Sequence, residues 1–108
     1  MRYTGQISEI DTEDFDYVVT EAILTNERVA IDWEEGGEPF HLLAQSRDGG
    51  RTYRGTCGMP RPDPDMEVRL TRLDTFDTVP RLLVYWVIHS VGDEFCSLIQ
   101  LEPAPKGE

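Results

Sequence analysis

Two histidines and two cysteines have the most specific chemistry in this sequence. His41 precedes Cys57 across one expected turn, and His89 precedes Cys96 across another. If each pair lies opposite on adjacent strands, two imidazoles and two thiols come from two hairpins. Two nitrogen and two thiolate ligands make a tetrahedral zinc set, so the four residues are a candidate structural zinc site.

This zinc hypothesis depends on two turn registers. A three-residue loop over residues 48–50 makes His41 oppose Cys57, and a two-residue turn over residues 92–93 makes His89 oppose Cys96. A shift of one residue separates either pair, and the sequence lacks the Cys-x2-Cys spacing typical of zinc sites. The alternative is an ordinary half-exposed histidine beside a packed cysteine, with both thiols free and no cofactor.

Catalysis has weaker support in the sequence than zinc binding. A cysteine nucleophile with a histidine base would use the same four residues, but both cysteines lie in β-compatible runs, where an unreactive packed thiol is expected. Acidic residues are too abundant to single out a catalytic pair. The chain has no GxxxxGK[ST], HExxH, GxSxG or GxGxxG motif. The sequence favours a non-catalytic protein without deciding the question.

The charge distribution suggests a partner. The formal net charge is −11, which argues against direct nucleic-acid binding because such binding depends on clustered Lys and Arg. Residues 1–46 hold eleven acids against Arg2 and Arg28. An acidic surface that carries aromatic anchors would meet a basic surface of a protein partner, as an inhibitor, immunity protein or DNA mimic does. The expected contact residues are Tyr17, Trp33, Glu34, Glu35, Tyr85 and Trp86.

A second functional hypothesis is a small β-barrel that binds an apolar ligand in a cavity lined by residues such as Tyr85, Trp86 and Phe95. A barrel of eight short strands can also fill its interior with its own side chains. The sequence therefore leaves three hypotheses open: a protein-interaction module, an apolar-ligand-binding barrel and a zinc-binding domain.

Period-2 alternation of apolar and polar residues predicts the elements that carry these side chains. It marks strands at residues 3–8, 28–34 and 66–71, and a hairpin at 40–58 around the turn at 48–50. Residues 81–89 are apolar on both faces, as in a strand covered on both sides, and a turn leads them into 95–101. Residues 12–24 fit either an amphipathic helix or a strand rich in β-branched residues.

These elements predict an all-β fold: an antiparallel meander of about seven or eight short strands in a small barrel or sandwich. If residues 12–24 are helical, the fold becomes α+β with one helix. Residues 59–65 alternate prolines with other residues and predict an extended connection. We expect one domain over residues 1–102 and a flexible tail at 103–108.

The setting of the protein follows from weaker signals. No apolar run approaches the length of a membrane span, and the first ten residues do not resemble a signal peptide. We therefore expect a cytoplasmic protein that does not associate with membranes. The sequence does not indicate an oligomeric state.

Overall fold

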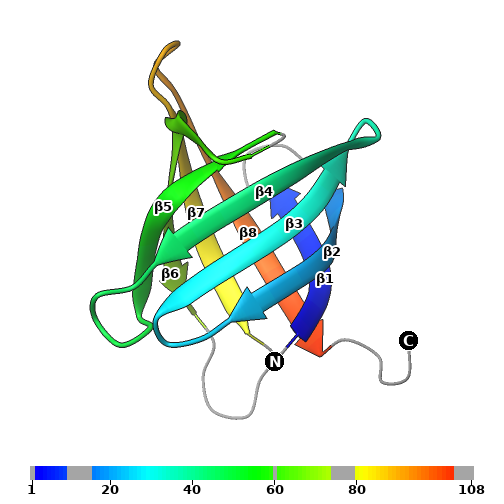
Figure 1. Ribbon diagram of the computed structural model, residues 1–108, viewed down its shortest axis with the longest axis vertical. Coiled ribbons are helices and arrows are strands. Elements are labelled where there is room, and N and C mark those ends of the chain that lie inside the picture. The colour runs from blue at the N-terminus through cyan, green and yellow to red at the C-terminus, as the bar shows by residue number, and fades with distance from the viewer. Residues whose placement is uncertain (1, 10–15, 60, 74–79, 104–108) are drawn as a thin grey trace.

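The computed structural model describes residues 2–9, 16–59, 61–73 and 80–103. Each strand pairs antiparallel with the next one in sequence, and the last pairs with the first, so the sheet closes into a barrel (Figure 1). The strands are β1 (Arg2–Glu9), β2 (Asp16–Leu24), β3 (Arg28–Glu35), β4 (Glu38–Gln45), β5 (Thr52–Gly58), β6 (Asp63–Arg72), β7 (Arg81–Ile88) and β8 (Asp93–Pro103).

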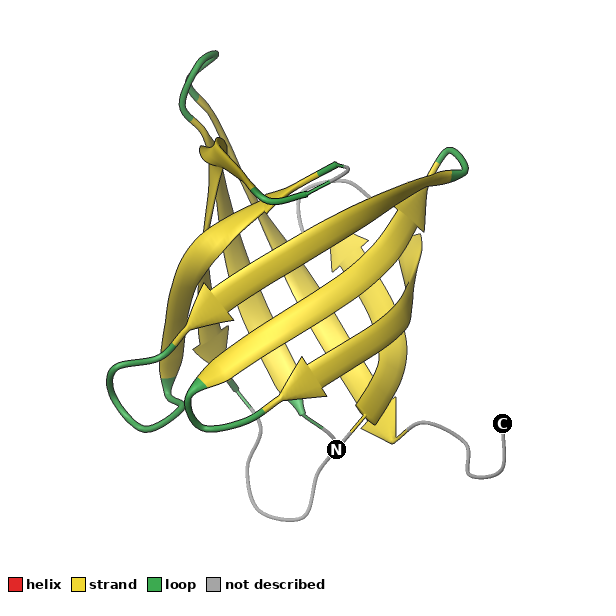
Figure 2. Ribbon diagram, viewed as in Figure 1, coloured by secondary structure: helices red, strands yellow, loops and turns green. Residues whose placement is uncertain are grey.

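The predicted all-β meander is confirmed, and the described residues contain strands and loops but no helix (Figure 2). The helical alternative for residues 12–24 is wrong over 16–24, which form β2; residues 12–15 lie outside the described part. Val18, Val19 and Thr20 are β-branched and favour the pleated conformation. Nowhere in the described ranges is there a helix able to cross a membrane.

The two ends of the barrel are built differently. One end carries the β2–β3 turn and the β4–β5 loop, and the other carries the β3–β4 and β7–β8 turns (Figure 1). We call the first the closed end, because large aliphatic side chains and Tyr53 fill it. Its buried inward residues are Leu24, Val29, Ala44, Tyr53, Leu70, Leu82 and Leu101. The Tyr53 hydroxyl donates to the Thr25 carbonyl oxygen at 2.6 Å and ties β5 to the β2–β3 turn.

Two glycines allow neighbouring strands to approach closely. A Cβ at Gly5 would fall on the carbonyl oxygen of Gln100, and one at Gly55 would fall on that of Leu43 and lie 2.6 Å from the Cα of Ala44. The obstructing atoms belong to the backbone, so they cannot move aside as a side chain would. Gly5 also lies at a register shift between β1 and β2, the kind of irregularity that bends a strand for closure.

The predicted register of the central hairpin is wrong by one residue. Leu42 faces Cys57, and His41 faces Gly58. The β4–β5 connection runs over residues 46–51, longer than the predicted loop, because the Asp48 carboxylate accepts hydrogen bonds from the backbone nitrogens of Arg51 and Thr52 at 3.1 and 3.0 Å. The Asp48 side chain therefore stabilises a loop that is wider than a tight turn.

The predicted register of the last hairpin is also wrong. Cys96 faces Tyr85, and His89 lies in the turn. The turn covers residues 89–92, where Gly92 has a φ of 71° and its nitrogen donates to the Ile88 carbonyl at 2.9 Å. Asp65 of β6 fastens this turn, since its carboxylate accepts from the nitrogen and the hydroxyl of Ser90 at 2.8 and 2.6 Å.

Candidate functional site

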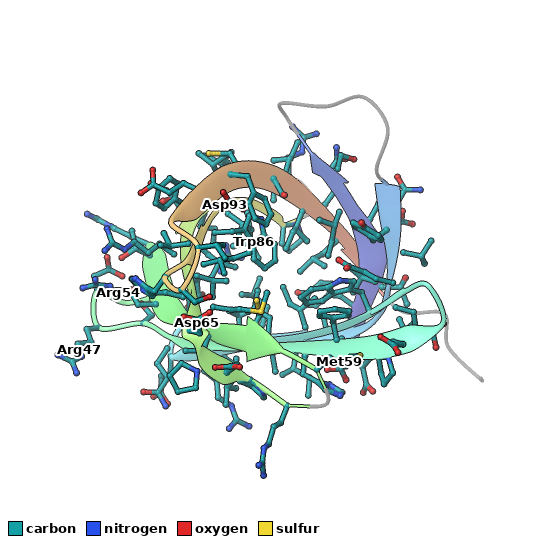
Figure 3. All side chains as sticks on the ribbon, turned by 90° about the horizontal axis from the view of Figure 1, so that it is seen from above. Arg47, Arg54, Met59, Asp65, Trp86 and Asp93 are labelled. Atoms are coloured by element: carbon teal, nitrogen blue, oxygen red, sulfur yellow. The ribbon has the colours of Figure 1, made fainter. Side chains whose placement is uncertain are left out.

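The end of the barrel opposite the closed end, which we call the open end, contains a cavity of about 260 Å³. We call it the aromatic cup, because five aromatic side chains contribute to its wall. Figure 3 looks down on this end and places Trp86 within the ring of strands, whereas Arg47 and Arg54 project from the outside. The cup is lined by Ile7, Tyr17, Trp33, Glu35, Phe40, Cys57, Met66, Trp86, Ile88, Phe95 and Ser97.

Two hairpins build the aromatic wall. Trp33 of β3 is the cross-strand partner of Phe40 of β4, and Trp86 of β7 is the partner of Phe95 of β8. Each pair is stacked, with ring centroids 5.7 Å apart in the first and 5.8 Å apart in the second. The two tryptophans meet edge to face at 5.8 Å. Four rings therefore form one continuous contact chain, and each favourable pair adds to the stability of the wall.

The indole nitrogens of the cup have partners within it. Trp86 Nε1 donates to Ser97 Oγ at 2.8 Å in a buried hydrogen bond, and Trp33 Nε1 donates to Glu35 Oε1 at 3.1 Å. Among the described side chains that are not exposed, no buried nitrogen or oxygen lacks a hydrogen-bond partner. Both tryptophans are thus fixed in orientation, and the cup presents mainly ring faces and aliphatic groups.

Cys57 contributes a neutral thiol to the cup. Burial, together with the nearby carboxylates of Glu35 and Asp63, raises the pKa of Cys57 to about 12. Since the thiolate is the nucleophile and the metal ligand, this side chain acts as a packing group at neutral pH. Both cysteines are free, and Cys96 lies half-buried on the outer face of β8.

Acidic side chains surround the mouth of the cup. At the open end, the described residues of the turns and adjoining strand ends of β3 to β8 hold seven carboxylates and one arginine, Arg61. We call this set the acidic rim. Its carboxylates are Glu34, Glu35, Glu38, Asp63, Asp65, Asp93 and Glu94.

The residues predicted as partner contacts divide between the two faces of the sheet. Tyr17, Trp33, Glu35 and Trp86 line the cup, and Trp33 is only 3% exposed. Glu34 is exposed on the rim. Tyr85 points to the outer face of β7, where a hydrogen bond to Glu94 raises its pKa. Trp33 and Trp86 therefore point into the barrel and are too buried to serve as anchors on an outer surface.

Of the three cavity residues named from the sequence, Trp86 and Phe95 line the cup and Tyr85 does not. Sequence reasoning named Tyr17, Trp33 and Glu35 only as partner contacts and assigned Cys57 to a metal site. It missed Ile7, Phe40, Met66, Ile88 and Ser97. The alternation within each strand held the missing signal. Inward positions recur every second residue, so the inward Trp33 implies that Ile31 and Glu35 point inward as well.

The four candidate zinc ligands are not brought together. His41 lies on the outer face, with its Nδ1 2.8 Å from Asp32 Oδ1, and His89 Nε2 lies 3.1 Å from Glu67 Oε1. Cys57 points inward and Cys96 outward. In the described ranges, no group of three or more His, Cys, Asp or Glu residues could hold a metal ion.

Other hollows occur on the outside of the barrel. One of about 330 Å³ is lined by Gln45, Arg47, Asp48, Thr52 and Arg54. It lies on the exposed outer wall, and the Asp48 carboxylate there is engaged by its own loop. The aromatic cup lies within the barrel and its lining is mainly apolar, as that of binding cavities usually is, so it is the candidate functional site.

Comparison with protein-family models, with curated proteins and with solved structures gave no match.

Proposed function

We propose that this protein binds a small, largely apolar ligand in the aromatic cup. The observation that carries the proposal is the cavity of about 260 Å³, open at its mouth and walled in part by Tyr17, Trp33, Phe40, Trp86 and Phe95. An apolar cavity of about 150 Å³ is enough to hold benzene. The cup therefore suits a molecule with one or two rings.

The chemistry of the lining supports binding rather than catalysis. The cup's polar groups include Glu35, Cys57 and Ser97. Ser97 Oγ accepts the Trp86 hydrogen bond, and the raised pKa keeps the Cys57 thiol neutral. An activated nucleophile needs a lowered pKa or an adjacent base, and neither thiol nor hydroxyl shows this arrangement here.

Intrinsic fluorescence provides a direct test. Trp33 and Trp86 are the only two tryptophans of the chain, and both line the cup. Titration with a soluble ring compound such as 2-phenylethanol should change the emission and saturate.

A blocked cup supplies the matched control. Ile88→Phe places a ring in the cup at a half-exposed position and should weaken binding. Val91→Phe adds the same ring in the same hairpin at a site 66% exposed and should leave binding unchanged. Equal binding by both variants, or the lack of any saturable response to ring compounds, would refute the proposal.

A protein partner with a basic surface is a second candidate, supported by the acidic rim. Electrostatic association of this kind weakens as salt screens the charges. Pull-down at about 50 mM and about 500 mM salt with the unmodified protein and with a Glu34→Lys/Glu38→Lys variant tests it. A partner captured equally by both proteins at both salt concentrations would contradict a role for the rim.

A further inference from the structure

Charge is segregated between the two ends of the barrel. At the closed end, the described residues of the turns and strand ends of β2 to β8 carry five arginines, Arg28, Arg47, Arg51, Arg72 and Arg81, against Glu27, Asp48 and Glu102. The acidic rim carries seven carboxylates against Arg61. Three rim carboxylates, Glu34, Glu35 and Glu38, come from the acidic N-terminal part of the sequence, and β6 and β8 add Asp63, Asp65, Asp93 and Glu94.

One rim carboxylate belongs to the cup itself. Glu35 is half-buried, lines the cavity, and accepts the hydrogen bond of Trp33 Nε1. Its charge therefore lies beside the stacked rings of Trp33 and Phe40. The negative charge of Glu35 also acts within the cavity at Cys57, where the carboxylates of Glu35 and Asp63 both disfavour the thiolate.

Aromatic faces and a carboxylate attract the same kind of ligand. The negative face of an aromatic ring attracts a cation, most strongly for tryptophan. A cleft bordered by one sign of charge concentrates ions of the opposite sign and repels ions of the same sign. An anion of equal size would meet the acidic rim on entry and Glu35 inside.

We propose that the aromatic cup selects a monocation with an apolar body, an amine or quaternary ammonium attached to a ring or short hydrocarbon, over a neutral or anionic molecule of the same size. The apolar body occupies the cavity beside the contacting rings, and the ammonium group lies toward Glu35 at the mouth. This inference rests on the proposed function, because it names the ligand class of the same cavity.

The test compares three probes of similar size: 2-phenylethylamine, 2-phenylethanol and 3-phenylpropanoate, which are cationic, neutral and anionic at pH 7. Each is titrated into the full chain and followed by tryptophan fluorescence and by calorimetry. We expect the amine to bind about tenfold more tightly than the alcohol, and the anion to bind least. The difference between amine and anion should shrink as ionic strength rises.

Two variants locate the selectivity. Glu35→Gln keeps an oxygen that can accept from Trp33 and removes only the charge, so it should weaken amine binding about three- to tenfold and leave alcohol binding unchanged. Glu34→Gln removes the same charge at the exposed neighbouring position and should have a much smaller effect.

The outcomes separate the two proposals. Equal affinity for all three probes, or an amine affinity that is insensitive to Glu35→Gln, would overturn cation selection while the binding function stands. If none of the probes binds, the proposed function fails and this inference fails with it.

Discussion

The buried hydrogen bond between Trp86 and Ser97 provides the sharpest test of how the aromatic cup is held. Trp86 Nε1 donates to Ser97 Oγ at 2.8 Å, and the two residues are 6% and 1% exposed. Ser97→Ala leaves the indole N–H without its partner in an apolar interior. Such an unsatisfied group costs about 1–3 kcal/mol. The free energy of unfolding should fall by that amount.

Urea unfolding followed by circular dichroism measures this loss. With a urea dependence of about 1–3 kcal/mol per molar, the midpoint should fall by roughly 1 M. Ser8→Ala is the matched control, because Ser8 lies half-exposed on the outer face of β1 and a change there should cost less than about 0.5 kcal/mol.

A double-mutant cycle separates the hydrogen bond from simple packing. Trp86→Phe removes the donor, so adding Ser97→Ala to it should cost about 1 kcal/mol less than Ser97→Ala costs alone. Additive effects, or a Ser97→Ala variant as stable as the original protein, would show that this bond does not hold the indole in place.

Three further predictions concern the barrel and its loops. Gly55→Ala should lower the free energy of unfolding by several kcal/mol or prevent folding, because the added Cβ meets backbone atoms. Gly92→Ala should lower it by about 1–2 kcal/mol, because the added Cβ meets open space but the backbone φ is 71°. Equal urea midpoints for the two variants would contradict this difference. Hydrogen bonds from the Thr52 nitrogen and hydroxyl hold the pKa of Asp48 well below its usual range. The contribution of the Asp48 carboxylate to the free energy of unfolding is therefore complete above the unfolded-state pKa of about 3.9 and is lost as the pH falls below that value. The difference in urea midpoint between the original protein and Asp48→Asn should thus narrow from pH 7 to about pH 3. With a thiol reagent, Cys96 should react in the native protein and Cys57 only after unfolding, and rapid reaction of both would refute the burial of Cys57.

Strand positions in this protein follow from its sequence because each is encoded locally. The alternation over residues 28–34 and 66–71 falls within β3 and β6, and the apolar run 81–89 matches β7 except for its last residue. A period of two needs no information from distant parts of the chain. Apart from β2, whose residues also fitted a helix, the existence and order of the strands were therefore predictable, as was a closed barrel as one of two architectures.

Register was not predictable, because particular side-chain hydrogen bonds set the loop lengths. Asp48 widens the β4–β5 loop, and Asp65, on a different hairpin, fastens the β7–β8 turn through Ser90. Neither interaction can be inferred from the local alternation of apolar and polar residues. A one-residue error moves a side chain to the opposite face, and it separated His41 from Cys57.

The residues that line the cup were identified only in part, because the sequence does not show which face of a strand points inward. Choosing Trp86 together with Tyr85, and Glu34 together with Glu35, selected adjacent residues that must point to opposite faces of a strand. Only one member of each pair, Trp86 and Glu35, lines the cup. Which face is inward becomes known only when the barrel closes.

Closure of the barrel also explains why its two ends differ. Along β3 the inward residues run Val29, Ile31, Trp33 and Glu35, from buried aliphatic groups at the closed end to a ring and a charge at the mouth. Trp33 and Trp86 are too large and rigid to interdigitate as aliphatic side chains do, and their stacked partners Phe40 and Phe95 hold them against the wall. Space therefore remains beside this chain of rings even though the aliphatic half is filled. Most of the largest fully buried side chains of the described residues are aliphatic, so the cavity lies where aromatic side chains replace them, at the mouth of the barrel.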